Sequence, residues 1–228
     1  MNGRLRRFVT SLCVLIALFL LWEASVRVFG ISELVLPKPS EVAVALVEYW
    51  GGILPHAYQT LYTTLLGFLL GATLGIALGV LIGSNKLAYD TIYPLLVGFS
   101  SVPKVAVVPI FVLWFGAGTM PAILTAMIIC LFPIVVNVAT GIATVEPELV
   151  DVMRAMKATR RQILWNVSLP RSLPYLFASL KVAITLAFVG AVVAETVASN
   201  KGIGNMMMIA SSSFNVPLTF AGLMVLAA

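Results

Sequence analysis

The sequence predicts an all-α, polytopic membrane protein, a bundle of about six transmembrane helices. The first observation is composition: 61% of the 228 residues are hydrophobic and 10% are charged, too few charges to cover a soluble surface. The second is that apolar runs of about 20 residues, the length that crosses a bilayer, recur along the chain. The third is that charges lie mainly between these runs, which indicates a lipid bilayer and argues against a nucleic-acid partner.

The first apolar run, 8–29, is predicted to be a transmembrane helix rather than a signal peptide, because no small-residue cleavage site follows it. Three arginines precede it, Arg4, Arg6 and Arg7. Positive charge stays on the cytoplasmic side, so the N-terminus is predicted to be cytoplasmic.

The segment 30–56 is predicted to be external and close to the bilayer surface. Prolines interrupt its start, Ser40 is the predicted N-cap, and 41–50 has the pattern of a short amphipathic helix. The chain is therefore divided into an N-terminal part, 1–57, and a main transmembrane domain, 58–228.

The second span, 58–83, carries glycines every four residues, at Gly67, Gly71, Gly75, Gly79 and Gly83. This spacing aligns them on one helical face, where two backbones can approach closely in lipid. Helix packing is the favoured interpretation, and a lining of a solute path is the alternative.

The remaining spans follow in order. The third, 91–114, contains Pro94, Pro103 and Pro109 and is predicted to be kinked or broken. The fourth covers 120–141 and the fifth 173–198. The sixth begins near Pro217 and contains only about a dozen residues where about 20 are needed, so the last span is predicted to be truncated.

Basic residues support this topology. With the N-terminus inside, the segments 84–90 and 146–171 are also inside. The predicted inside segments contain most of the cations: Arg4, Arg6, Arg7, Lys86, Arg154, Lys157, Arg160, Arg161 and Arg171. The predicted outside segments contain only Lys38 and Lys201, with Arg27 at a boundary.

The loop 146–171, between spans four and five, is the longest charged segment. Pro147 and Glu148 suit a helix start, and Leu149, Val152, Met153 and Met156 recur at helical spacing. A second short helix, 161–167, is predicted to stop before Pro170. Two short amphipathic helices with basic flanks suit docking in a groove of a partner protein or, equally well on physical grounds, binding to anionic lipid.

The same loop resembles the "EAA" loop of permease subunits of bacterial ATP-binding-cassette importers, which reads Glu-Ala-Ala-x-x-x-Gly, about nine residues, then Ile-x-Leu-Pro. Asp151 stands at the glutamate position, Ala155 and Ala158 flank the centre, and Leu169 and Pro170 close the motif. Other stretches resemble the nitrate, sulfonate and taurine branch of that family: 102–106, 113–118, 132–134, 194–195 and 202–204. The resemblance covers about 58–226, and its strength lies in the order and spacing of these pieces.

The chain departs from the motif in two places. Val152 and Met153 replace the two alanines, and Lys157 replaces the glycine. A glycine would serve the turn between the two coupling helices, where a backbone without a Cβ bends most easily. Lysine at this position is expected to strain the turn or change its contact with the ATPase.

The resemblance implies an inner-membrane permease that forms the pathway for a small, sulfonate-, nitrate- or taurine-like anion. Implied partners are a cytosolic ATPase, an external solute-binding protein and a second permease copy, most simply in a homodimer. The implied ATPase-coupling residues are Glu148, Asp151, Met153, Arg154, Ala155, Met156, Lys157, Ala158, Leu169 and Pro170. ATP would be bound by the partner, because nothing in this chain resembles a phosphate-binding loop; the chain itself is expected to be no enzyme and to need no cofactor.

Three further residues are candidates for the pathway or gate, because polar groups at membrane depth are functional candidates by default. Lys104 could meet an anionic solute or extend its amine to the interface, and Asn137 could line the path or bond a neighbouring helix. Glu195, near the outer end of span five, could shape the external gate or be merely interfacial. The two cysteines and the single histidine are scattered, so no metal site is expected.

Two other classes compete with the importer hypothesis. A secondary transporter would have paired ionisable groups within its spans and inverted repeats. An intramembrane enzyme would have a nucleophile with a base, or clustered metal ligands. The charged double-helix loop 146–171 is explained by the importer hypothesis and by neither alternative.

Overall fold

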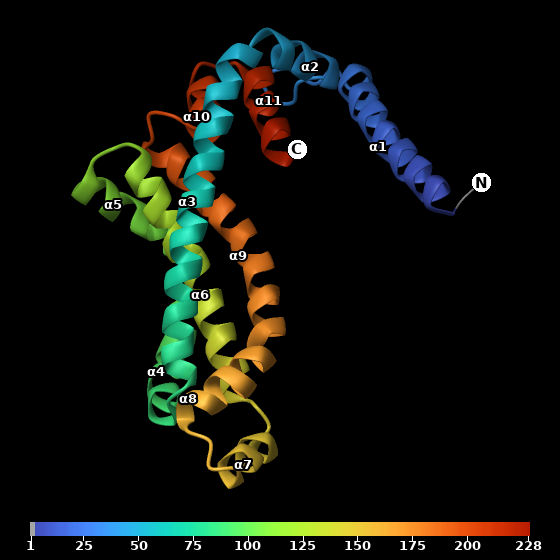
Figure 1. The fold of residues 1–228 in the computed structure, drawn as a ribbon. Coiled ribbons are helices and arrows are strands. Elements are labelled where there is room, and N and C mark those ends of the chain that lie inside the picture. The colour runs from blue at the N-terminus through green and yellow to red at the C-terminus, as the bar shows by residue number, and fades with distance from the viewer. Residues whose placement is uncertain (1–2) are drawn as a thin grey trace. The chain divides into compact units, whose positions relative to one another are not determined.

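Helices account for most of the described backbone in the computed structural model, which describes residues 3–228, with the backbone alone for 3–6 and 8 (Figure 1). The side chains of Arg4 and Arg6, which carry part of the topology prediction, therefore lie outside the described residues. The helices are α1 (Gly3–Val28), α2 (Pro39–Glu48), α3 (Trp50–Gly83), α4 (Lys86–Ser100), α5 (Val108–Phe115), α6 (Thr119–Ala143), α7 (Pro147–Ala155), α8 (Arg160–Ile163), α9 (Leu169–Ala198), α10 (Ile203–Ser212) and α11 (Val216–Ala227).

The chain forms two compact units. The first contains the residues up to Tyr58 together with Gly202–Ala228, and the second is Gln59–Lys201. The expected division at 57/58 lies beside the first of these boundaries, whereas the C-terminal segment groups with the N-terminal one rather than with the main domain.

Helix α6 is the centre of the second unit, with α3 and α9 along its sides (Figure 1). Its buried face repeats every four residues, at Ala126, Cys130, Ile134, Val138 and Ile142. Helix α9 meets this face with three fully buried alanines, also four residues apart: Ala183, Ala187 and Ala191. Small side chains allow close approach of two helices, so packing holds the bundle together where lipid supplies little hydrophobic drive.

The glycine face of α3 lies directly against α6. A Cβ added to Gly67 would lie 2.6 Å from Cβ of Ala126, and one added to Gly79 would lie 2.7 Å from Cβ of Val138. Contact partners therefore advance in the same direction along both helices, which makes α3 and α6 parallel. Gly190 lies against Ala126 and Gly141 against Ser172, so α9 runs antiparallel to α6.

These directions place the start of α4 and the loop between α6 and α9 at one end of the second unit (Figure 1). At the opposite end, the side-chain amide of Gln59 donates to the Thr119 hydroxyl at 2.9 Å. The Gly118 amide donates there to the Ala198 carbonyl at 3.0 Å.

The third apolar run is broken, as its prolines predict. Helix α4 and the segment Lys104–Phe115, which begins with a 3₁₀ turn at Lys104–Val107, meet at a bend of 85°. The break lies at 101–103, where Pro103 has no backbone N–H to continue the helix.

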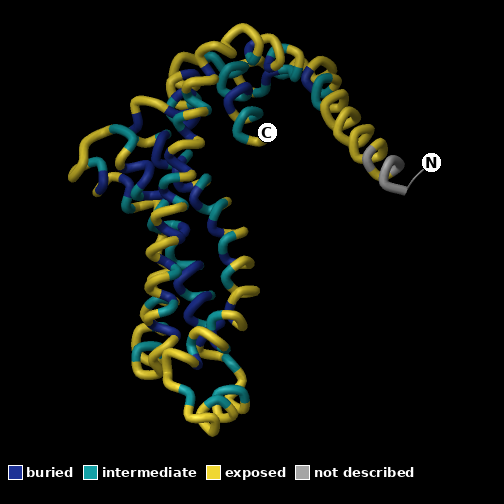
Figure 2. Tube along the Cα trace, viewed as in Figure 1, coloured by how far each residue is buried: buried dark blue, intermediate teal, exposed yellow. Residues whose placement is uncertain are grey.

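The number of spans is smaller by length and composition than the six expected. Among the described residues, four helical stretches are long and apolar enough to cross a membrane, or five if the bent pair is one span. The sixth apolar run forms α11, which has 12 residues. Much of the apolar surface of α1 and α3 is exposed, as lipid-facing helices require (Figure 2).

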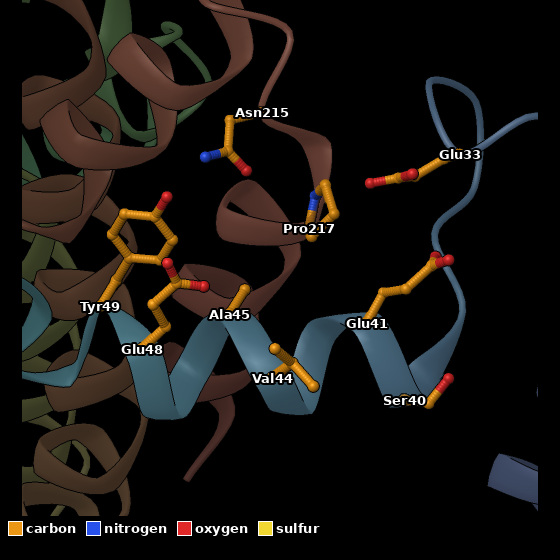
Figure 3. A pocket seen from close by; sticks show the side chains of 9 residues that line it. All are labelled: Glu33, Ser40, Glu41, Val44, Ala45, Glu48, Tyr49, Asn215 and Pro217. Carbon is orange, nitrogen blue, oxygen red and sulfur yellow. The ribbon is translucent and has the colours of Figure 1, made fainter.

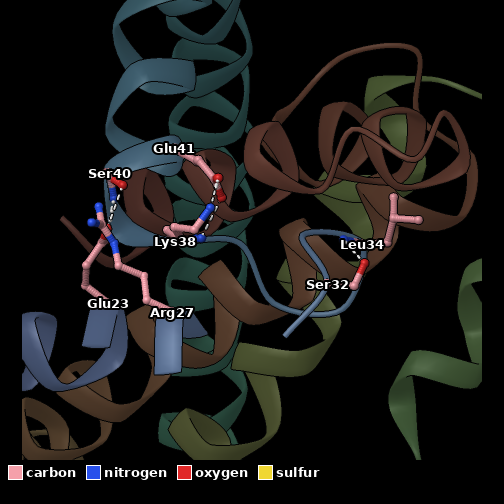
Figure 4. Close-up of polar contacts among 7 residues, drawn as sticks. All are labelled: Glu23, Arg27, Ser32, Leu34, Lys38, Ser40 and Glu41. Carbon is pink, nitrogen blue, oxygen red and sulfur yellow. Dashed lines mark hydrogen bonds and ion pairs between the residues drawn. The ribbon is translucent and has the colours of Figure 1, made fainter. Parts of the chain in front are cut away.

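The first unit has its own small core, in which Val42 and Ala45 of α2 pack with Ile53, Met206 and Ala221. Polar contacts organise the approach to α2 (Figure 4). The Glu23 carboxylate accepts bonds from the Ser40 amide at 3.1 Å and the Ser40 hydroxyl at 2.9 Å.

The N-cap of α2 is Lys38 rather than the predicted Ser40. Glu41, in the first turn, reaches back to accept the Lys38 backbone N–H at 2.8 Å and to pair with its ammonium (Figure 4). These two bonds to the Lys38 side chain and backbone hold the pKa of the Glu41 carboxyl below its usual value. The reach-back from the third helical position satisfies an otherwise free N–H, which explains why the helix begins two residues early.

Candidate functional site

Most residues of helix α7 are exposed, and the helix lies beyond the end of the three-helix core (Figures 1 and 2). The predicted apolar stripe divides in two. Leu149 and Met153 are half-buried, whereas Val152 and Met156, four residues apart and so on one face, are 58% and 74% exposed. Asp151 pairs with Arg154 at 3.2 Å on the exposed surface.

A left-handed turn ends α7. Lys157 has a φ of 60°, its N–H donates to the Arg154 carbonyl, and the Ala158 N–H donates to the Met153 carbonyl, both at 2.9 Å. This pair of bonds is the Schellman motif, whose left-handed residue is usually glycine. Lys157 occupies the position of the motif glycine, so the strain expected from the sequence coincides with a left-handed residue that carries a Cβ.

The segment after this turn is anchored to the bundle. The Thr159 hydroxyl accepts the Gln162 N–H, and the Gln162 side chain accepts the Thr159 N–H at 2.7 Å, which makes a capping box. Ile163 is buried, and Leu164 and Leu169 pack against the core of α3, α6 and α9. The segment that follows α7 is therefore fixed to the three-helix core, and it holds the C-terminal end of α7 in place.

The structure corrects the prediction that the second short helix stops before Pro170. Helix α8 continues through a π-helical turn, Leu164–Ser168, directly into α9. Within this turn the Leu169 N–H donates to the Leu164 carbonyl, five residues back, and the wider turn accommodates the missing N–H and the ring of Pro170. Arg171 and Glu146 then pair at 3.2 Å across the two ends of the loop.

The loop is basic as well as apolar. It contains five arginine or lysine residues and three acidic ones, and all eight are exposed. Glu148, Ala155 and Pro170 are also exposed, while Ala158 and Leu169 are half-buried. An exposed apolar pair within a basic surface, presented by a short helix with a fixed turn, is suited to a groove on a partner protein.

The candidate pathway residues lie apart from this loop in the sequence. Lys104, in the broken span, is half-buried; its ammonium donates to the Ser100 carbonyl at 2.8 Å and lies 5.2 Å from the ring centre of Phe132. The Asn137 amide donates to the Pro133 carbonyl of its own helix at 2.8 Å.

Glu195 is fully buried inside the protein. Its two carboxylate oxygens accept bonds from the hydroxyls of Thr60 at 2.7 Å and Thr63 at 3.0 Å, both on α3. Neither threonine was predicted from the sequence to belong to a site. The signal was present, because two hydroxyls three residues apart in an apolar run lie on one helical face.

A groove of about 370 Å³ lies on the first unit along α2 (Figure 3). Carboxylates from Glu33, Glu41 and Glu48 line it with Tyr49 and Asn215. Glu41 is already paired with Lys38. The groove is acidic. The loop 146–171, with its exposed apolar pair, is the better-defined candidate site.

Comparison with known proteins identifies the class. Residues 71–228 match the family described as "Binding-protein-dependent transport system inner membrane component", and the chain belongs to this family. It is 37% identical over 218 residues to the riboflavin transport system permease protein RibX of Chloroflexus aurantiacus, which covers 93% of this chain and 80% of that protein. It is 26% identical over 229 residues to the taurine transport system permease protein TauC of Escherichia coli, which covers 97% and 83%.

A solved structure shares the fold. The MetNI methionine ABC transporter, in an inward-facing conformation, has a chain that superposes with a TM-score of 0.57 at 22% identity, covering 75% of this chain and 93% of that chain. The sequence-based expectations of an all-helical membrane bundle and of an importer permease are therefore confirmed. The chain is a membrane-spanning component of a binding-protein-dependent transport system.

Proposed function

We propose that the coupling loop, 146–171, lies in the cytosol and docks on a separate ATP-binding-cassette ATPase. The observation that carries this proposal is the exposed pair formed by Val152 of α7 and Met156, the C-cap of that helix. The Lys157 turn fixes this pair, and Leu164 and Leu169 anchor the following segment to the bundle. ATP binds to the partner, and closure of the ATPase pushes the loop. The bundle then switches between inward and outward openings, a change that needs two alternative packings of its helices.

The complete importer contains a second permease copy and an external binding protein that delivers the solute. Family membership supports this assembly, and the small face of α3 and α6 supports tight packing within each copy. The N-terminus is cytoplasmic, and the broken third span with Lys104 and Asn137 contributes to the pathway.

The solute carries an anionic group. Lys104 supports this assignment, because it places a half-buried cation at the bend of the third span, and one relative is a taurine permease. A riboflavin permease is also a relative, so the uptake of labelled taurine and the uptake of labelled riboflavin into proteoliposomes are measured separately. Uptake of riboflavin alone would contradict an anionic solute.

The docking proposal is tested by co-purification in detergent with the ATPase encoded beside this gene. Val152→Glu and Met156→Glu place a charge on the exposed pair without entering the core, so the permease should fold normally. Each should reduce captured ATPase by roughly tenfold, since a buried uncompensated charge costs more than about 1.4 kcal/mol.

The matched control is Val44→Glu, a 63% exposed valine on the short helix α2 of the other unit. It should leave ATPase capture unchanged. If both α7 variants retain the ATPase as well as the unsubstituted chain does, α7 is not the contact.

A further inference from the structure

Glu195, Thr60 and Thr63 form a buried polar cluster between α9 and α3, here called the Glu195 clamp. The carboxylate is 0% exposed and the two threonines are 2% and 1% exposed. Stability alone does not account for such a cluster, because a buried carboxylate is expensive and well-packed apolar residues in its place are often neutral or stabilising.

Thr63 can leave the clamp without losing a partner for its hydroxyl. The Thr63 oxygen lies 3.0 Å from Glu195 Oε1, and it also lies 3.0 Å from the Thr60 carbonyl and 3.1 Å from the Gln59 carbonyl. A hydroxyl has one proton to donate. Thr63 can therefore donate either across to α9 or back to its own helix, so its hydroxyl has an acceptor in both arrangements.

The coupling loop and the clamp are at opposite ends of one continuous helix. Arg160–Ala198 runs for 39 residues from the capping box of the loop, through the π-helical turn, to the residues around Glu195. At about 1.5 Å of rise per residue, this run is about 58 Å long. At the centre of the bundle, this helix packs against α6 through three buried alanines, whose side chains are small.

We propose that the Glu195 clamp transfers movement of the coupling loop to α3 at the far end of the bundle. A push on the loop moves the helix that carries Glu195, and the carboxylate carries α3 with it through Thr60 and Thr63. Glu195 is thus a positioning residue for the external opening, and not a solute ligand. This inference rests on the proposed function, because it needs an ATPase acting on the loop.

The test uses proteoliposomes that hold the complete transporter with its ATPase and external binding protein. The readout is the amount of labelled taurine or riboflavin, whichever the unsubstituted transporter imports, per ATP hydrolysed. Glu195→Leu and the double variant Thr60→Val with Thr63→Val should each lower this ratio by roughly fivefold or more, the lower end of typical coupling between sites. The triple variant should be no worse than either, because all three residues act through one contact.

Two controls separate coupling from packing. Glu195→Gln keeps the shape and can still exchange bonds with both hydroxyls, so it should restore most of the ratio. Thr125→Val removes another buried hydroxyl of the same unit, one that donates to the Pro121 carbonyl of its own helix at 2.7 Å, and should leave the ratio unchanged.

The inference is overturned if the ratio stays normal in the assembled Glu195→Leu and double-threonine complexes, or if Thr125→Val lowers it equally. If either of these variants does not assemble, the triple variant decides, since it leaves neither a buried carboxylate nor a buried hydroxyl without its partner. Failure of the proposed function is recognised separately, because the unsubstituted chain would then capture no ATPase.

Discussion

At the scale of single residues, Lys157 shows how far a sequence pattern can lead. The departure from the motif glycine marked a turn, and the structure gives that turn a left-handed residue with two Schellman bonds. A residue with a Cβ in this conformation costs about 1 kcal/mol relative to glycine.

Lys157→Gly should therefore stabilise the turn by about 1 kcal/mol, which corresponds to roughly fivefold slower amide hydrogen exchange at Ala158. Lys157→Ala, which removes the charge and keeps the Cβ, is the matched control and should give no such gain. Equal protection in the alanine variant would show that charge, rather than backbone strain, limits the turn.

Other residue-scale contacts were beyond reach of the sequence. Glu195 was recognised as a candidate, but its partners lie 132 and 135 positions away along the chain. Their pairing depends on the rotation and register of α3 against α9, which local patterns do not specify. The Glu41 reach-back to Lys38, by contrast, spans three residues and follows from helix-start chemistry alone.

At the scale of elements, the periodicity of the sequence predicted helix-packing faces well, whereas the ends of helices were predicted less well. The four-residue glycine pattern anticipated a packing face, and the five glycines lie against α6 in the structure. The prediction of a helix end before Pro170 was wrong. A proline within a helical run usually marks an end, whereas here a π-helical turn accommodates it.

The glycine face makes a sharp prediction for α3. A Cβ at position 67 would lie 2.9 Å from the Ile123 carbonyl oxygen, and a backbone atom cannot rotate away. Gly67→Ala should lower the free energy of unfolding by about 1–3 kcal/mol, measured as a lower thermal midpoint in detergent.

Gly52→Ala is the control within the same helix, since a Cβ there meets nothing within 4 Å. It should be neutral or stabilising by up to about 1 kcal/mol through helix propensity. Equal loss of stability in both variants would show that backbone freedom, not the close approach to α6, is what these glycines supply.

At the scale of the whole molecule, composition alone was sufficient to predict a membrane protein, because 10% charged residues cannot cover the surface of a soluble protein of this length. The number of complete spans was harder to predict, because the bent third run and the 12-residue helix α11 are only partly long enough to cross a membrane. The association of Gly202–Ala228 with the N-terminal unit is a long-range pairing with no local signature.

Sidedness is the remaining whole-molecule property that the sequence predicts. The contacts of α6 make α3 parallel and α9 antiparallel to it, so the coupling loop and the start of α4 emerge at one end. The basic residues of that end should hold it in the cytosol. The prediction is tested with single cysteines in a chain in which Cys13 and Cys130 are replaced by alanine.

Met156→Cys, at a 74% exposed position on the coupling loop, should resist a membrane-impermeant thiol reagent in intact cells and react once they are permeabilised. Val47→Cys, at a 78% exposed position on α2, should react in intact cells, because 30–56 is expected to be external. Labelling of Met156→Cys from outside would invert the topology and remove the proposed ATPase contact with it. Protection of Val47→Cys alone would instead place α2 within the bilayer surface, which leaves the coupling loop where the basic residues put it.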